Sequence, residues 1–77
     1  MTRAIVWSKK YCPYCIKAKD LLDSKGISYE ERNIGGRQWT REDLLESVPN
    51  AKTVPQVFLD GKLIGTYDQL KAYFDNQ

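Results

Sequence analysis

Apolar residues in the first half of this chain follow two spacings, which predict two kinds of element. A short apolar stretch over 3–7 predicts a buried strand. Helical spacing over 13–25 predicts a helix that Gly26 ends. Alternation over 27–34 predicts a second strand. The positions expected to face inward in the helix and the second strand are Ala18, Leu21, Leu22, Ile27, Tyr29 and Glu31.

A capped helix is predicted in the middle of the chain. Thr40 and Asp43 have the spacing of a capping box, so the helix is expected to begin there and to end before Pro49. Trp39 and Leu44 are placed as its hydrophobic staple.

A hairpin and a last helix complete the predicted elements. Asp60-Gly61, between apolar residues at 57–59 and 62–64, is the strongest short turn signal for a β-hairpin. The last helix is expected to begin within 66–68 and to end near 74, with these residues inward: Leu70, Tyr73 and Phe74.

The resulting order, β-α-β-α-β-β-α, predicts an α/β fold of minimal thioredoxin type. A strand, a helix and a second strand imply a right-handed crossover and a parallel pair. The hairpin adds two more strands, so we expect a central four-stranded mixed sheet flanked by helices on both faces. With 77 residues, the segment 1–77 is expected to be one domain.

Composition and charge narrow the functional classes. A formal charge of +2 does not suggest nucleic-acid binding, which requires a basic stripe, although it is compatible with a small anionic ligand. No apolar run approaches membrane-spanning length, and no signal peptide is visible. A single cysteine pair at short spacing favours a reducing compartment, so we expect a cytoplasmic protein.

Cys12 and Cys15 are the only cysteines, and the chain has no histidine. Pro13 is tolerated in a first helical turn, which puts Cys12 at the helix cap and Cys15 one turn inside. Unpaired N–H groups at the helix start, with Lys9 and the following lysine nearby, favour the thiolate of Cys12 and make it the expected nucleophile. Cys15 lies on the same helix face and is the expected resolving thiol. Two thiols are too few ligands for a structural zinc, so no metal is expected.

Taken together, the motifs resemble those of dithiol glutaredoxins over nearly the whole chain. The resemblance implies a thioredoxin fold, disulfide reduction as the activity, and glutathione as a co-substrate with no bound cofactor. The residues that carry it are Lys9, Cys12-Pro13-Tyr14-Cys15, Thr53-Val54-Pro55-Gln56-Val57-Phe58 and Ile64-Gly65-Thr66-Tyr67-Asp68.

The resemblance also implies a set of glutathione-binding residues. Residues alone favour a trans Val54-Pro55 bond at the start of an edge strand, whereas the family pattern implies a cis bond that turns the Val54 backbone toward the sulfurs. Asp68 can pair with the γ-glutamyl ammonium, and the helix start beside it can hold the carboxylate. The expected binding residues are Lys9, Tyr14, Lys52, Thr53, Val54, Pro55, Gly65, Thr66, Tyr67 and Asp68.

One residue of this expected site departs from the family pattern, and two lysines match it. Thr66 stands where the family usually carries a second glycine, and it adds bulk and a hydroxyl near the ligand. Lys9 and Lys52 stand where the family carries cations for the glycine carboxylate. Further candidates from the loop and the helix that follows it are Arg37, Gln38 and Arg41.

Two other functions fit part of the pattern. A redoxin recharged by thioredoxin reductase, serving ribonucleotide reductase, would have the same size and cysteine spacing. An iron–sulfur carrier would use Cys12 from each of two chains together with two glutathione thiols. The expected partners are glutathione and disulfide-containing proteins, with ribonucleotide reductase as one of them by family analogy. A monomer is expected, with no membrane partner.

Overall fold

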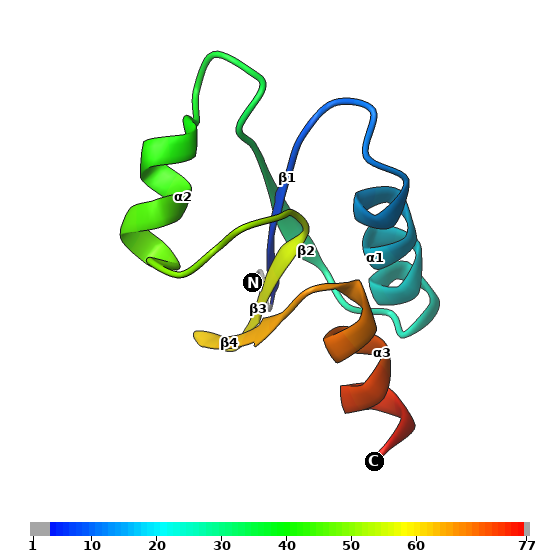
Figure 1. Ribbon diagram of the computed structural model, residues 1–77. Helices are drawn as coiled ribbons and strands as arrows, with labels where there is room; N and C mark the ends of the chain where they lie inside the picture. Colours follow the sequence, from blue (N-terminus) through cyan, green and yellow to red (C-terminus); the bar gives the residue numbers. More distant parts are fainter. Residues whose placement is uncertain (1–3, 77) are drawn as a thin grey trace.

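The computed structural model describes residues 4–76, and its elements follow the predicted order (Figure 1). The expected α/β fold with a four-stranded mixed sheet is confirmed. The first strand was expected to include Arg3, which lies outside the described residues. The elements are β1 (Ala4–Ser8), α1 (Pro13–Ser24), β2 (Tyr29–Asn33), α2 (Arg41–Ser47), β3 (Gln56–Leu59), β4 (Lys62–Gly65) and α3 (Tyr67–Asp75).

The sheet has the strand order β2-β1-β3-β4. β1 and β2 are parallel, as expected for strands joined through a helix, and the other two pairs are antiparallel. Trp7 pairs with Gln56, and Val57 pairs with Gly65. The carboxyl ends of β1 and β4 and the amino end of β3 therefore meet at one end of the sheet. The segments that follow β1, precede β3 and follow β4 are brought together there.

Helices cover both faces of the sheet, with α1 and α3 on one face and α2 on the other (Figure 1). Alternate residues of β1 supply the two cores because successive side chains of a strand point to opposite faces. Ala4 and Val6 pack with Ala18 and Leu22 of α1. Trp7 packs in the second core with Leu44 and Val48, and Trp39 lies against this cluster with its ring edge-on to that of Trp7.

Predicted element boundaries differ from the observed ones where the chain leaves α1. The second strand was expected over 27–34 but spans Tyr29–Asn33. Gly26 has φ of +68°, and the N–H of Ile27 donates to the carbonyl of Leu22. Ile27 therefore completes the helix end, where its side chain is still buried as predicted.

The inward position of Tyr73 was predicted wrongly. Leu70 is fully buried and Phe74 is partly buried in the core, whereas Tyr73 is 40% exposed. Leu70 and Phe74 are four residues apart and share one helix face. Tyr73 lies beside that face, and it lines an open cavity of about 680 Å³ at the opposite end of the sheet from the cysteines.

Within residues 4–76, no helix combines the length and apolar character needed to cross a lipid bilayer.

Candidate active site

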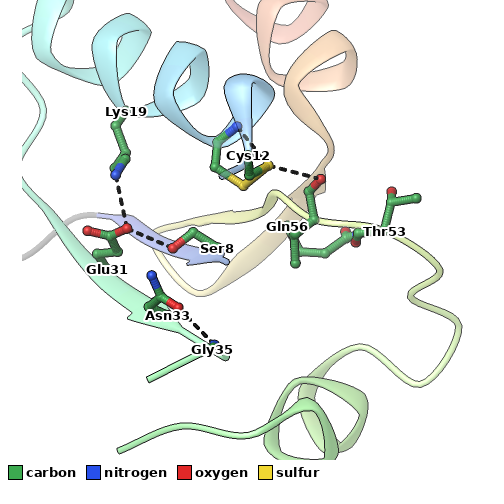
Figure 2. The surroundings of a disulfide bond; sticks show 10 residues. Ser8, Cys12, Lys19, Glu31, Asn33, Gly35, Thr53 and Gln56 are labelled. Carbon is green, nitrogen blue, oxygen red and sulfur yellow. Dashed lines mark hydrogen bonds and ion pairs between the residues drawn. A yellow bond between two sulfur atoms is a disulfide. The ribbon is translucent and has the colours of Figure 1, made fainter. Parts of the chain in front are cut away.

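Cys12 and Cys15 form a disulfide at the start of α1, with their Cα atoms 5.2 Å apart (Figure 2). Cys12 is the N-cap, as predicted, and its sulfur accepts a hydrogen bond of 3.2 Å from the N–H of Cys15. Pro13 takes the first helical position. Cys12 is 6% exposed and Cys15 is 1% exposed. The helix therefore buries one sulfur more deeply than the other and points an N–H at the outer one.

The preceding residue, Tyr11, has φ of +58° and is 96% exposed. This left-handed conformation is uncommon for a residue with a side chain, and it lets the chain turn sharply from the loop after β1 into the cap of α1. Tyr11 is thus a surface residue of the turn that places Cys12.

Val54 lies directly beside the disulfide. The Val54-Pro55 peptide bond is cis, so the expectation drawn from the family pattern is confirmed and the trans alternative is wrong. The carbonyl oxygen of Val54 lies 3.8 Å from Sγ of Cys12. Gln56 donates from Nε2 to the carbonyl of Thr53 at 2.9 Å, a hydrogen bond that spans the cis Val54-Pro55 bond. Backbone atoms of this segment therefore face the outer sulfur.

A pocket of about 340 Å³ opens next to Val54. The ring of Tyr14 lies 6.1 Å from that of Tyr67, and Nζ of Lys17 lies 5.1 Å from the centre of the Tyr14 ring. We call this the aromatic pocket. Its lining consists of seven of the predicted binding residues, which are Tyr14, Thr53, Val54, Pro55, Thr66, Tyr67 and Asp68.

A second, smaller pocket of about 50 Å³, the cationic pocket, shares Thr53 and Val54 with the aromatic pocket. It brings together Lys9 from the loop after β1, Lys52 from the loop before β3 and Arg41 from α2. Arg37 and Gln38, two of the alternative candidates, are exposed in the loop before α2 and do not line it. The sequence did not indicate its apolar lining, which is Ile34, Leu44, Leu45 and Ala51.

Gly65 shapes the aromatic pocket without lining it. Its φ is +119°, and a Cβ placed there would collide with the side-chain amide of Gln69. That amide oxygen accepts a 2.9 Å hydrogen bond from the N–H of Thr66, the N-cap of α3. Gly65 therefore leaves room for the group that caps α3, and α3 in turn presents Tyr67 and Asp68 to the pocket.

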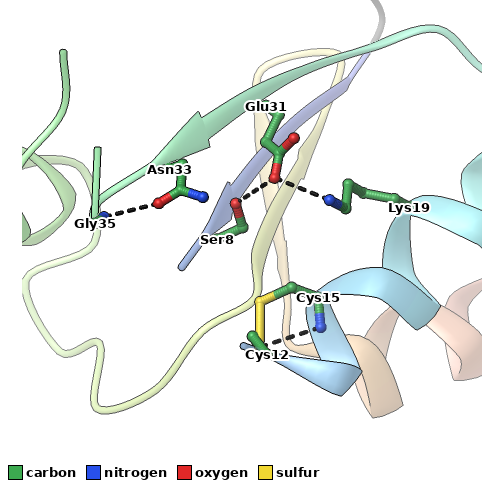
Figure 3. A network of polar contacts seen from close by, with 7 residues as sticks. All are labelled: Ser8, Cys12, Cys15, Lys19, Glu31, Asn33 and Gly35. Atoms are coloured by element: carbon green, nitrogen blue, oxygen red, sulfur yellow. Dashed lines mark hydrogen bonds and ion pairs between the residues drawn. A yellow bond between two sulfur atoms is a disulfide. The ribbon is translucent and has the colours of Figure 1, made fainter. Parts of the chain in front are cut away.

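A polar network that was not predicted joins the buried Ser8 to Glu31 and Lys19, whose side chains are partly exposed (Figure 3). Ser8, at the end of β1, is fully buried and donates 2.7 Å from Oγ to Oε2 of Glu31. Lys19 of α1 donates to the same oxygen at 2.9 Å. Hydrogen bonds from Ser8 and then Lys19 lower the pKa of Glu31 below its usual 4.5. Alternation in β2 was the only available signal, and the inward position that it predicted for Glu31 was wrong, because the side chain is 35% exposed.

The fold has the element order β-α-β-α-β-β-α, with a cysteine pair at the amino end of a helix and a cis proline beside it. This combination defines a thioredoxin-fold thiol–disulfide oxidoreductase. Comparison with known proteins narrows this class. Residues 4–64 match the family profile described as Glutaredoxin, and the chain belongs to the glutaredoxin family.

Individual relatives and solved structures agree with this assignment. The chain is 42% identical over 72 residues to glutaredoxin 3 of Escherichia coli (strain K12), covering 94% of this chain and 86% of the relative. The holo form of glutaredoxin C1 from Populus tremula x tremuloides superposes with a TM-score of 0.85 at 31% identity, covering 99% and 77% of the two chains. A buckwheat glutaredoxin–glutathione complex has a TM-score of 0.79 at 32% identity, covering 96% and 70%.

Proposed function

We propose that this protein is a glutathione-dependent reductase of protein disulfides and of mixed disulfides with glutathione. The observation that carries the proposal is that two adjoining pockets meet at Val54, beside the outer sulfur. A ligand that filled both pockets would cross Val54 and bring its middle portion to Cys12. Glutathione has this form, since it is an extended tripeptide with its thiol in the middle and a carboxylate at each end.

Each end of glutathione has a complementary group in this arrangement. The glycine carboxylate would lie in the cationic pocket, near Lys9, Arg41 and Lys52. The γ-glutamyl end would lie at the start of α3, where helix N–H groups favour its carboxylate and Asp68 favours its ammonium. In the middle, the backbone of Val54 would pair with the cysteinyl backbone like an added strand. The buckwheat family member was solved with glutathione, which supports the same ligand here.

In the proposed reaction, the thiolate of Cys12 attacks a disulfide and releases one partner as a thiol. Cys12 is the attacking sulfur because it is the less buried of the two and is the N-cap of α1. The mixed disulfide on Cys12 is then cleared either by a second glutathione or by Cys15, which closes the disulfide seen here. Two glutathione molecules reduce that disulfide again and leave as glutathione disulfide.

Cysteine variants test the two roles. We expect Cys12→Ser to abolish all turnover because the only other cysteine, Cys15, is buried and out of reach of a substrate disulfide. Cys15→Ser should keep the reduction of glutathionylated substrates and lose the reduction of protein disulfides. Turnover by Cys12→Ser, or complete inactivity of Cys15→Ser, would contradict the assignment.

The glutathione requirement is tested by following NADPH oxidation with a small mixed disulfide of glutathione as substrate. One assay contains glutathione and glutathione reductase, and the other contains thioredoxin reductase alone. We expect turnover only in the first. Turnover only in the second would keep the cysteine roles but remove the glutathione site, and would favour the redoxin that serves ribonucleotide reductase.

The proposed partners and place of action follow from this chemistry. The expected protein partners are those with exposed disulfides or glutathionylated cysteines, and ribonucleotide reductase stays a prediction among them. Recharging by glutathione requires a reducing compartment, so a cytoplasmic location is proposed.

A further inference from the structure

Two large apolar side chains at the start of α1 are left in solvent. Tyr11 is 96% exposed and Ile16 is 56% exposed. They stand immediately before the N-cap, Cys12, and four residues after it. Apolar residues at these two positions often pack against each other as a hydrophobic staple and shield each other from water. A tyrosine that is almost completely exposed is not covered by Ile16, so the staple has not formed.

The backbone of Tyr11 makes its exposure more unusual. Its φ of +58° lies in the left-handed region, which glycine and asparagine adopt far more readily than a residue with a bulky side chain. A smaller residue would therefore make the same turn with less strain. The ring gains no packing within residues 4–76 that would offset this strain, because almost all of it is in solvent. Strain without a structural return is characteristic of positions where the side chain has a function.

Neither side chain belongs to the two pockets proposed to hold glutathione. The aromatic pocket and the cationic pocket are both lined without Tyr11 and Ile16. Ile16 also projects away from the aromatic pocket. It is two positions from Tyr14, which faces α3, and three positions from Lys19, which reaches across to β2. The proposed glutathione site therefore makes no use of either residue.

A protein substrate that reacts with Cys12 brings its own residues close to these two side chains. In the mixed disulfide, Sγ of Cys12 is bonded to a substrate sulfur at about 2.05 Å, so the neighbours of the substrate cysteine lie around the start of α1. Tyr11 adjoins Cys12, with consecutive Cα atoms about 3.8 Å apart. A disulfide of glutathione with a small thiol has no further residues to place there. The surface is therefore available to protein substrates in particular.

We propose that Tyr11 and Ile16 contact an apolar side chain next to the reactive cysteine of a protein substrate and so select disulfides that have such a neighbour. The substrate side chain would supply the apolar contact that the unformed staple lacks, with tyrosine as the aromatic anchor. The chemistry is that of the proposed function, on which this preference rests. The thiolate of Cys12 attacks one sulfur of the substrate disulfide, and the other sulfur leaves as a thiolate and takes a proton from solvent.

The test compares two peptide substrates that differ only beside their cysteines. Both are synthetic peptides with one internal disulfide; one has leucine on each side of both cysteines, and the other has serine at the same positions. A third substrate, the mixed disulfide of glutathione with 2-mercaptoethanol, has no such neighbours. Values of kcat/KM are measured by NADPH oxidation with glutathione and glutathione reductase. Each peptide value is divided by the rate of that peptide with glutathione alone, which corrects for intrinsic reactivity.

We expect the wild-type protein to prefer the leucine peptide by about tenfold, since partial burial of one apolar side chain supplies a factor of this size. Tyr11→Ala should remove most of the preference, and Tyr11→Phe should keep it. Ile16→Ala should reduce the preference as well, without disturbing α1, because alanine is a strong helix former. All three variants should reduce the small mixed disulfide as the wild type does. The matched control is Tyr73→Ala, which removes another exposed tyrosine at the opposite end of the sheet.

Several results would overturn this preference. A wild-type protein that does not distinguish the peptides, or a Tyr11→Ala variant that still does, would remove Tyr11 from substrate selection. Equal losses on all three substrates would mean that Tyr11 acts only through the turn that places Cys12. Sedimentation velocity that shows a wild-type dimer, dissociated by Tyr11→Ala, would assign the surface to a second copy of this chain.

The same assay separates this preference from the proposed function. If the wild-type protein fails to reduce the small mixed disulfide with glutathione, the proposed function has failed. If that substrate is reduced normally and the two peptides react alike, the preference alone has failed.

Discussion

At the scale of single residues, Glu31 couples the fold to pH. Its carboxylate is ionised more easily in the folded chain than in the unfolded one, because Ser8 and Lys19 donate to it. A lowered folded pKa adds stability at pH values above the usual 4.5, and this contribution is lost as the pH falls through the folded value.

We therefore predict that Glu31→Gln flattens the loss of stability in acid. Wild-type protein should lose unfolding free energy as the pH falls below about 4.5, and the variant should lose less over the same range. Urea denaturation at a series of acidic pH values measures both. The contribution has been misassigned if the two curves stay parallel down to the lowest pH.

At the scale of elements, the start of α3 depends on the residue that ends β4. Gly65 combines a φ of +119° with close approach of Gln69, whose amide oxygen caps the helix. The same helix start forms one wall of the aromatic pocket. Both the stability of the protein and the shape of the aromatic pocket therefore depend on Gly65.

Gly65→Ala is predicted to destabilise the protein by about 1–3 kcal/mol, through backbone strain and displacement of Gln69. It should also raise the KM for glutathione, because the displaced cap shifts Thr66 and the residues after it. Gly36→Ala is the matched control. Gly36 has no positive φ, and an added Cβ would lie 3.4 Å from the carbonyl of Asn33. Equal unfolding free energies for the two variants would contradict this account.

At the scale of the whole molecule, charge is distributed unevenly over a chain of formal charge +2. Lys9, Arg41 and Lys52 gather at the cationic pocket, next to the outer cysteine. Lys62 lines a different cavity, at the far end of the sheet. An anionic substrate would thus be attracted to the end of the molecule where it reacts, and salt would weaken that attraction.

Lys52→Glu is predicted to lower kcat/KM for a glutathionylated substrate by roughly tenfold at low salt, since it reverses one of three clustered cations. The loss should shrink as ionic strength rises, and alkylation of Cys12 by a small neutral reagent should change little. Lys62→Glu makes the same change in net charge and should have little effect on kcat/KM. If both variants behave alike, net charge and not the pocket is responsible.

Local features account for what the sequence could predict. The cap position of Cys12, the capping box at Thr40 and the Asp60-Gly61 turn depend on residues a few positions apart, and each was found as expected. The cis bond before Pro55 required a family resemblance as well, since the residues alone favour trans.

Contacts set by register account for what could not be predicted. Ser8 meets Glu31 across 23 residues, through the parallel pairing of β1 with β2, and no local pattern specifies that register. The same holds for the meeting of Arg41 with Lys9 and Lys52, which needs α2 to be placed on its face of the sheet. Periodicity also gave Tyr73 the wrong side, because the edge of a helix face depends on what packs beside it.

The unequal burial of the two sulfurs has a kinetic consequence. Since Cys15 is buried and Cys12 is the sulfur that lies beside Val54, where the two pockets meet, substrates can exchange electrons with the protein only at Cys12. The reductant and the disulfide substrate cannot both react at Cys12 at the same time. Reduction of the protein and reduction of the substrate must therefore alternate. Turnover should therefore follow ping-pong kinetics, with parallel lines in double-reciprocal plots of the two substrates.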